Sequence, residues 1–230
     1  MYDSLWQTID TLEQKNKEAS IMEKQKIELL RAVSHELKTP LTALSVLIES
    51  MQLNIGKYSD RDTYLEEASQ KVKETSELVT QILKSTQVEN IFDDAHYVET
   101  DINKMIHDSI NQTELIIKKK QINLHLKEVD SVHLHTHPEA LKKVISNVLN
   151  NAIQYTDSQG SIWIEIHHNA LSIENTCEPL SEKDLSQIFN PFYRPDYSRN
   201  RKQGGTGLCL HIVKEILTHL DMPYLFETTD

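Results

Sequence analysis

Two apolar stripes with steps of three and four residues run through the first ninety residues and constrain what this part can fold into. Only Ser34 interrupts the first stripe, and this part of the chain holds one glycine, Gly56, and one proline, Pro40. Such spacing is typical of long helices that present a narrow apolar seam to a partner helix. The first stripe contains Ile27, Leu30, Leu37, Leu41, Leu44, Ile48 and Met51, and the second contains Leu65, Ala68, Val72, Thr75, Val79 and Ile82.

A turn separates the two predicted helices. The segment 54–60 is polar and contains Gly56, and either Ser59 or Asp60 is suited to cap the second helix. The two helices therefore form a hairpin, whose narrow seams bury little surface alone, so we expect two copies to pair as a four-helix bundle. A weaker version of the same period upstream predicts a coiled-coil signalling helix at 1–24, ahead of a dimerisation domain at 25–92.

The composition changes near residues 91–96, which we interpret as a linker, and residues 97–230 mix helix and strand patterns. This order favours an α+β sandwich with helices on one face of a mixed sheet. The predicted helices are 101–120, 139–155 and 208–220, and the predicted strands are 122–126, 132–136, 162–166 and 171–173.

The overall composition excludes several classes of protein. The 230 residues carry a formal net charge of −11, and an acidic chain repels nucleic acid backbones. Two cysteines, Cys177 and Cys209, argue against a disulfide framework and fit a reducing compartment. The sequence contains no run of about 18 apolar residues, so it predicts no membrane span. The first residues do not resemble a signal peptide.

A candidate nucleophile lies within the first stripe. Because Ser34 occupies a seam position, we expect His35 to point just outside the seam, toward water, where a neutral imidazole can act as a nucleophile. Glu36 could orient the ring and accept its proton, and Thr39 lies on the same helical face one turn further on. Pro40 should bend the helix. The alternative is an exposed His-Glu pair on a coiled coil with an incidental proline.

Polar residues suited to a phosphate ligand recur in the second half. Asn147 and Asn151 share a face of the helix 139–155, and carboxamide oxygens suit Mg²⁺, although solvent-facing asparagines are the alternative. The segment 194–202 has four positive charges and one negative, and it runs into Gly204, Gly205 and Gly207, three of only five glycines. Glycines at a helix start let backbone amides approach phosphate.

Four segments resemble the motifs of sensor histidine kinases from two-component systems. His-Glu-Leu-Lys-Thr-Pro-Leu at 35–41 is similar to their H box, 145–156 to their N box and 187–194 to their F box. The segment 204–210 resembles the second glycine box of the ATP-binding fold shared with Hsp90, gyrase and MutL. The resemblance covers about residues 20–226, and it implies a four-helix-bundle dimerisation domain followed by an α/β-sandwich ATP-binding domain.

The resemblance also implies roles for single residues. His35 would be phosphorylated with Glu36 as general base, and Thr39 would position a water for dephosphorylation of the partner. Asn151 would bind Mg²⁺, Asn147 would lie beside the phosphates, and Tyr155 would lie against the adenine. Gln154 stands where a basic residue is usual. The remaining implied ATP contacts are Asn175, Phe189, Arg194, Arg199, Lys202, Gly204, Gly205, Thr206, Gly207 and Leu208.

The chain departs from the family pattern around the nucleotide. Asn175 stands where an aspartate usually accepts from the adenine amino group, and Cys177 and Pro179 replace both glycines of the first glycine box. Cys209 replaces a late glycine of the second box. Each change adds a side chain where the backbone should approach the nucleotide or the helix, so we expect weakened but not abolished ATP affinity.

These inferences predict a homodimeric kinase that autophosphorylates His35 from Mg-ATP and passes the phosphoryl group to an aspartate of a response regulator. The alternatives are a phosphatase-dominant or degenerate kinase and a non-enzymatic coiled-coil adaptor. The implied location is the cytoplasmic side of a membrane sensor, with membrane attachment only through upstream segments. The lid region is similar to that of VanS-type sensors of envelope stress.

Overall fold

The computed structural model describes residues 2–86, 91–92, 96–167, 170–195 and 205–229. The chain divides into two compact units, Met1–Val79 and Thr80–Asp230. None of the helices among these residues is both long and apolar enough to cross a membrane.

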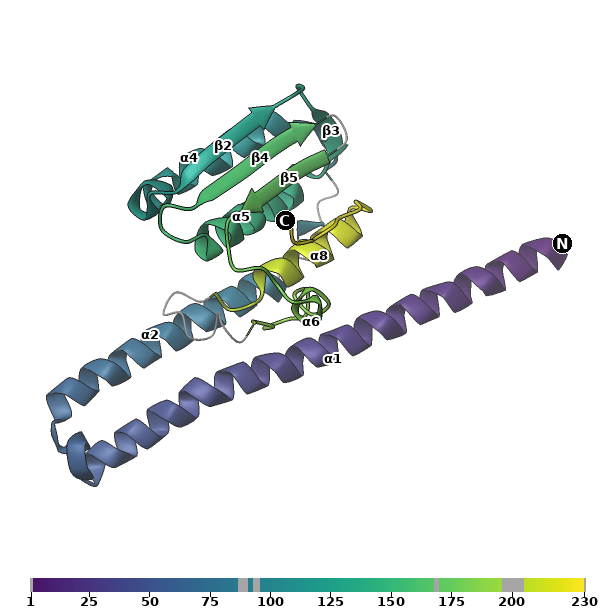
Figure 1. The fold of residues 1–230 in the computed structure, drawn as a ribbon. Helices are drawn as coiled ribbons and strands as arrows, with labels where there is room; N and C mark the ends of the chain where they lie inside the picture. The colour runs from purple at the N-terminus through teal and green to yellow at the C-terminus, as the bar shows by residue number, and fades with distance from the viewer. Residues whose placement is uncertain (1, 87–90, 93–95, 168–169, 196–204, 230) are drawn as a thin grey trace. The chain divides into compact units, whose positions relative to one another are not determined.

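The first unit is a helical hairpin (Figure 1). It consists of α1 (Tyr2–Gln52), a 3-10 turn η1 (Gly56–Ser59) and the greater part of α2 (Arg61–Thr86). At the start of α2, Asp60 Oδ2 accepts a 2.7 Å hydrogen bond from Thr63 Oγ1, and Asp60 Oδ1 accepts a 3.4 Å bond from Thr63 N. Asp60, one of the two expected caps, therefore satisfies an amide that the helix start would leave open.

The hairpin buries apolar side chains next to its turn, and much further along α2 Ile82 is 8% exposed. The buried side chains next to the turn are Leu47, Met51 and Ala68, and the rings of Tyr58 and Tyr64 pack beside them at a centroid distance of 4.7 Å. Further along, much of the predicted stripe stays open: Leu30 is 57% exposed, Leu41 51% and Val72 50%. The hairpin therefore leaves an apolar surface on both helices that its own chain does not cover.

The second unit contains a three-stranded sheet in the order β2 (Asn123–Glu128), β4 (Ser161–His167), β5 (Ala170–Asn175). β2 runs parallel to β4 and β5 runs antiparallel to it, as expected for a mixed sheet. Alternate side chains of β4 form the centre of the core, where Ile162, Ile164 and Ile166 are 0 to 1% exposed. On the opposite face Trp163 stacks on His125 at 5.6 Å, so this sheet has one buried and one solvated face.

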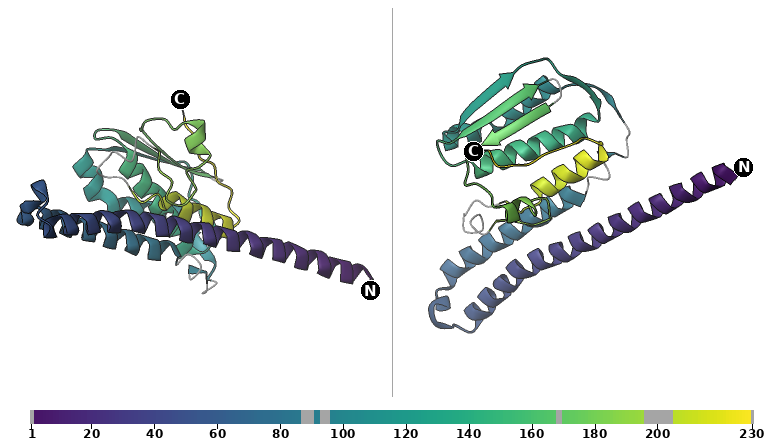
Figure 2. Two further views of the ribbon diagram at one scale, coloured as in Figure 1. Left: turned by 90° about the horizontal axis from the view of Figure 1, so that it is seen from below. Right: turned by 45° about the vertical axis from the view of Figure 1, so that its right-hand side comes forward.

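Three helices complete the sandwich. α4 (Ile102–Lys120) and α5 (Pro138–Tyr155) lie on the same side of the sheet, and α8 (Cys209–His219) packs against α5 (Figures 1 and 2). α6 (Glu182–Leu185) is a single short turn after β5. The buried residues of α4 and α5 recur every three to four positions, which explains why their apolar pattern predicted them closely.

The sequence predicted the strand at 132–136, but not its partner strand or the second, two-stranded sheet that the two form. β1 (Val98–Asp101) pairs antiparallel with β3 (His133–Thr136). Asp101, predicted as the first residue of a helix, is instead the last residue of β1, and its side chain accepts a 3.0 Å bond from Lys104 N as the N-cap of α4. A carboxylate at this position favours the capping geometry over the helical one.

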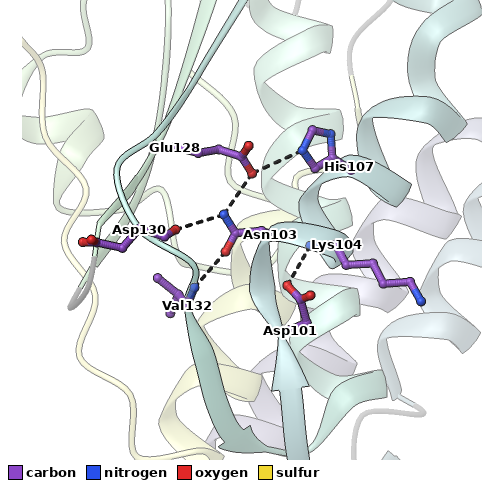
Figure 3. Close-up of polar contacts among 7 residues, drawn as sticks. All are labelled: Asp101, Asn103, Lys104, His107, Glu128, Asp130 and Val132. Atoms are coloured by element: carbon purple, nitrogen blue, oxygen red, sulfur yellow. Dashed lines mark hydrogen bonds and ion pairs between the residues drawn. The ribbon is translucent and has the colours of Figure 1, made fainter.

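The start of α4 is tied to the connection between β2 and β3 by one carboxamide (Figure 3). Asn103 Nδ2 donates to Glu128 Oε1 at 2.9 Å and to Asp130 O at 3.1 Å, while Asn103 Oδ1 accepts from Val132 N at 2.9 Å. His107 Nε2 lies 3.2 Å from the same oxygen of Glu128. These contacts join segments that are 25 to 29 residues apart in the sequence.

Candidate active site

His35 lies within α1 with 81% of its side chain exposed. Its Nδ1 is 3.8 Å from Glu36 Oε1, which is longer than a hydrogen bond. Thr39 Oγ1 donates a 3.2 Å hydrogen bond to the backbone oxygen of His35. α1 continues through Pro40, which lacks the N–H that would bond the carbonyl of Glu36. The histidine is thus accessible, with a carboxylate beside one nitrogen.

An open groove on α1 begins at the residue before His35. Its lining combines apolar side chains, small polar ones and one lysine, all from α1. The lining residues are Ser34, Leu37, Lys38, Leu41, Thr42, Ser45 and Val46. The groove belongs to the same uncovered seam as Leu30.

A pocket of about 80 Å³ lies in the second unit, between the C-terminal ends of α5 and β5 and the start of α8. Its walls combine carboxamides, aromatic rings, apolar side chains and glycine backbone. The lining residues are Asn151, Gln154, Tyr155, Asn175, Cys177, Leu180, Ile188, Tyr193, Pro195, Gly205, Gly207, Cys209, Leu210 and Phe226.

The pocket brings together six of the residues that the motifs singled out for ATP, from three parts of the sequence. Those six are Asn151, Gln154, Tyr155, Asn175, Gly205 and Gly207. Five others, Asn147, Phe189, Arg194, Thr206 and Leu208, are half-buried or buried but do not line it. Phe189 packs on Tyr224 at 5.2 Å and on Phe226 at 6.3 Å. Arg199, Lys202 and Gly204 lie outside the described residues.

Two asparagines carry buried donors that the described part of the chain leaves without an acceptor. They are Nδ2 of Asn147 and Nδ2 of Asn175. Buried polar groups in folded proteins are almost always hydrogen-bonded. Since Asn175 lines the pocket, its free donor fits a site that is completed by a ligand.

The glycine segment, residues 205–208, packs directly on the loop that contains Phe192 and Tyr193. Gly207 has φ +75°, and a Cβ there would come within 2.7 Å of Tyr193 O. Phe192 N donates to Gly207 O at 3.1 Å. At Gly205 a Cβ would lie 2.9 Å from Gln154 Oε1. The absence of side chains at these glycines therefore brings the start of α8 against the pocket wall.

The N-terminal cap of α6 also holds the loop that contains Phe192 and Tyr193. Ser181 Oγ donates to Asp184 Oδ2 at 2.5 Å, and Tyr193 OH donates to Asp184 Oδ1 at 2.7 Å. These two hydrogen bonds, the one from Ser181 first, hold the pKa of Asp184 below its ordinary value because they favour the ionised carboxylate. Tyr193, which lines the pocket, is thereby fixed at its hydroxyl end.

Lys120 supports the pocket from behind and was not predicted from the sequence. Its Nζ donates to three backbone oxygens at the end of α5: Ile153 O at 2.8 Å, Gln154 O at 2.9 Å and Thr156 O at 3.2 Å. Lys120 ends a run of three lysines, a pattern that favours a solvated position. Three other wall residues, Leu180, Pro195 and Phe226, likewise carry no signal beyond apolar or turn character. The remaining three, Ile188, Tyr193 and Leu210, lie within the F-box and glycine-box segments, although no role was predicted for them.

Both cysteines line the pocket, as their places in the glycine-box motifs suggested. Cys177 is exposed and Cys209 is partly buried. Burial raises the pKa of the Cys209 thiol, and the nearby charge of Lys143 opposes this shift. At neutral pH Cys209 is therefore a neutral, poorly reactive thiol.

Two family models match the chain. Residues 25–91 match the His Kinase A (phospho-acceptor) domain. Residues 136–225 match the histidine kinase-, DNA gyrase B- and HSP90-like ATPase, the part that holds the pocket. The fold and the pocket thus define an ATP-binding domain of this type, preceded by a phospho-acceptor hairpin that carries His35.

Curated relatives agree with this class. The chain is 31% identical over 226 residues to sensor histidine protein kinase HK06 of Streptococcus pneumoniae, covering 98% of this chain and 50% of the relative. It is 31% identical over 237 residues to sensor protein VanSB of Enterococcus faecalis, covering 100% and 52%. The chain belongs to the sensor histidine kinases of two-component systems, and it spans about half the length of these relatives.

Solved structures share the fold. Histidine kinase ThkA in complex with response regulator protein TrrA matches with a TM-score of 0.55 at 22% identity, over 73% of this chain and 50% of that chain. Acinetobacter baumannii histidine kinase AdeS matches with a TM-score of 0.53 at 21% identity, over 80% and 86%. At these identities the likeness concerns the arrangement of helices and strands.

Proposed function

We propose that this chain is the kinase core of a sensor, which binds Mg-ATP in the pocket of the second unit and autophosphorylates His35. The single observation that carries the proposal is the convergence of Asn151, Tyr155 and the glycine segment on one pocket of an ATPase domain. The exposed imidazole of His35, in a domain of the phospho-acceptor family, supplies the nucleophile.

The chemistry follows from the two ring nitrogens. Nε2 of His35 attacks the γ-phosphorus, the bond from that phosphorus to the bridging oxygen breaks, and ADP leaves. The proton on Nδ1 passes toward Glu36, whose Oε1 is 3.8 Å away. Positioning and charge neutralisation should supply most of the rate, as in other phosphoryl transfers.

Magnesium belongs to this proposal because the pocket offers a suitable ligand. Asn151 presents a carboxamide oxygen, and Mg²⁺ is commonly bound through one or two protein oxygens together with phosphates and water. The cation would neutralise charge on the phosphates. Arg194 and Arg199 or Lys202 would add positive charge, as the sequence motifs imply.

Partners and location are part of the same proposal. The uncovered apolar seam of the hairpin supports a homodimer, and the solved complex of histidine kinase ThkA with response regulator protein TrrA supports a response regulator as the acceptor of the phosphoryl group. We retain the division into 1–24, 25–92 and 97–230, attachment to a membrane through upstream segments, and the VanS-like subgroup as predictions. A chain with little kinase activity that mainly dephosphorylates its regulator remains the second candidate, because Cys177 and Cys209 line the pocket.

Incorporation of label from γ-labelled ATP with Mg²⁺ tests the proposal. We expect acid-labile, base-stable label on the parent chain, and its loss in both His35→Gln and Asn151→Ala. His96→Gln, which changes another exposed histidine, is the matched control and should keep the label. A folded parent chain without label would favour the second candidate, and label surviving in His35→Gln would exclude His35 as the acceptor.

A further inference from the structure

The side chain of Asn175 projects into the pocket from a fixed backbone position. Asn175 is the last residue of β5 and pairs with Ile162 of β4, the central strand. The next residue is held as well, because Thr176 N donates to Ser161 O at 3.0 Å. The carboxamide of Asn175 is therefore presented by the edge of the sheet rather than by a mobile loop.

One end of this carboxamide lacks a partner. Nδ2 of Asn175 is buried, and no acceptor for it lies among the residues that the structure describes. Because folded proteins rarely leave a buried donor unpaired, we expect a ligand atom to accept from it. The aromatic and apolar walls, Tyr155, Ile188 and Phe226, suit a flat ring better than a phosphate group.

A carboxamide recognises a different edge from a carboxylate. At neutral pH an aspartate offers acceptors only, whereas an asparagine offers one acceptor and one donor side by side. Adenine presents an amino donor on C6 beside the acceptor N1, which matches Oδ1 and Nδ2 together. Guanine presents the reverse pair, the acceptor O6 beside the donor N1–H, and the carboxamide matches this pair after a half-turn about its last bond.

We propose that Asn175 reads the purine edge through its Nδ2 donor and thereby admits guanine as well as adenine nucleotides to the pocket. This inference rests on the proposed nucleotide-binding function and adds the base specificity of the site. A carboxylate at this position would have no donor for O6 of guanine, so the wider specificity belongs to the carboxamide.

Equilibrium binding to the full chain with Mg²⁺ tests the inference, using ATP, GTP and 1-deaza-ATP, which keeps the 6-amino group but lacks the N1 acceptor. We expect GTP to bind within about tenfold of ATP, and 1-deaza-ATP to bind about tenfold more weakly than ATP, as for the loss of one base hydrogen bond. The near-isosteric Asn175→Asp variant removes the donor. It should lose affinity for GTP and should no longer distinguish 1-deaza-ATP from ATP.

Asn111→Asp, an exposed change of the same chemistry in α4, is the matched control and should reproduce the parent chain. Thermal melting of each variant verifies that it is folded. Equal binding of ATP and 1-deaza-ATP by the parent chain, or ATP binding without GTP binding, would overturn the base-reading role while leaving the ATP site intact. Failure to bind any of the three nucleotides would overturn both the inference and the nucleotide-binding function beneath it.

Discussion

At the scale of single residues, Lys120 illustrates how a charge far from the chemistry can shape a site. The last carbonyls of a helix have no intrahelical donor and carry partial negative charge. Lys120 Nζ donates to carbonyls of Ile153 and Gln154 at that end of α5. Since Gln154 and Tyr155 form one wall of the pocket, the ammonium group positions this wall.

Lys120→Met keeps the aliphatic stem and removes the ammonium group. We expect the free energy of unfolding to fall by about 2 kcal/mol, the usual size for a lost charged hydrogen-bond donor at a helix end. Nucleotide affinity should fall with it, because the end of α5 loses its cap. Urea denaturation measures the first effect. Lys119→Met, one residue earlier and exposed, should change stability little, and equal effects of the two variants would refute the capping role.

What a sequence can reveal about single residues depends on how local the signal is. Asn151 and Tyr155 belong to a contiguous motif, so their place in the pocket could be expected. The role of Lys120 depends on carbonyls 33 to 36 residues away, and no feature of a lysine run reports such a distance. Phe226 belongs to the C-terminal segment, and only the folded chain places it in the wall of the same pocket as Asn151. No local pattern in the sequence reports this placement.

At the scale of elements, the position of the glycine segment depends on close contact between its backbone and the backbone at Phe192 and Tyr193. Gly207 has a positive φ, and the backbone at Phe192 and Tyr193 fills the space that a side chain would need. The hydrogen bond from Phe192 N to Gly207 O joins the same two segments. The start of α8 is therefore placed by backbone contact.

Gly207→Ala should separate these segments. A Cβ 2.7 Å from Tyr193 O cannot be accommodated without movement of the backbone, in addition to strain of about 1 kcal/mol or more from the positive φ. We expect nucleotide affinity to fall more than tenfold. Gly56→Ala is a matched control, because Gly56 also has a positive φ but nothing within 4 Å of its Cβ position. If both variants bound nucleotide like the parent chain, close packing at Gly207 would be irrelevant to the site.

The elements that the sequence predicted well are those with a strong repeating pattern. α4, α5 and α8 each begin and end within one residue of expectation, because their apolar faces repeat over eleven residues or more. β1 has four residues, of which only Thr100 is buried, and its partner β3 lies more than thirty residues away. A strand that short is defined by its partner and not by its own sequence.

At the scale of the whole molecule, the main feature is that the apolar stripes of α1 and α2 stay largely exposed in the described part of one copy. The sequence predicted their spacing, whereas their degree of exposure required the structure. Near the turn Leu47, Met51 and Ala68 pack within the hairpin, while Leu41 and Val72 remain half exposed. Exposed apolar rows of this kind are covered by further helices in a bundle.

We expect the chain to run as a dimer, with a mass about twice the 26.6 kDa of one copy. Leu41→Glu and Val72→Glu place a charge in the seam and should shift the mass toward that of a monomer. Light scattering coupled to size exclusion gives the mass directly. Leu115→Glu in α4, where the leucine is 82% exposed, should leave the mass unchanged. A monomeric parent chain would contradict the prediction.

The open seam also makes the pairing of two hairpins depend on the concentration of the protein. If a second copy covers it, folding of the hairpin is a bimolecular equilibrium, and its apparent stability rises with concentration by mass action. Cellular copy number then becomes a control variable for pairing. A chain with an intact seam and a damaged pocket would also sequester normal copies in mixed pairs, so loss-of-function alleles of that kind would act dominantly.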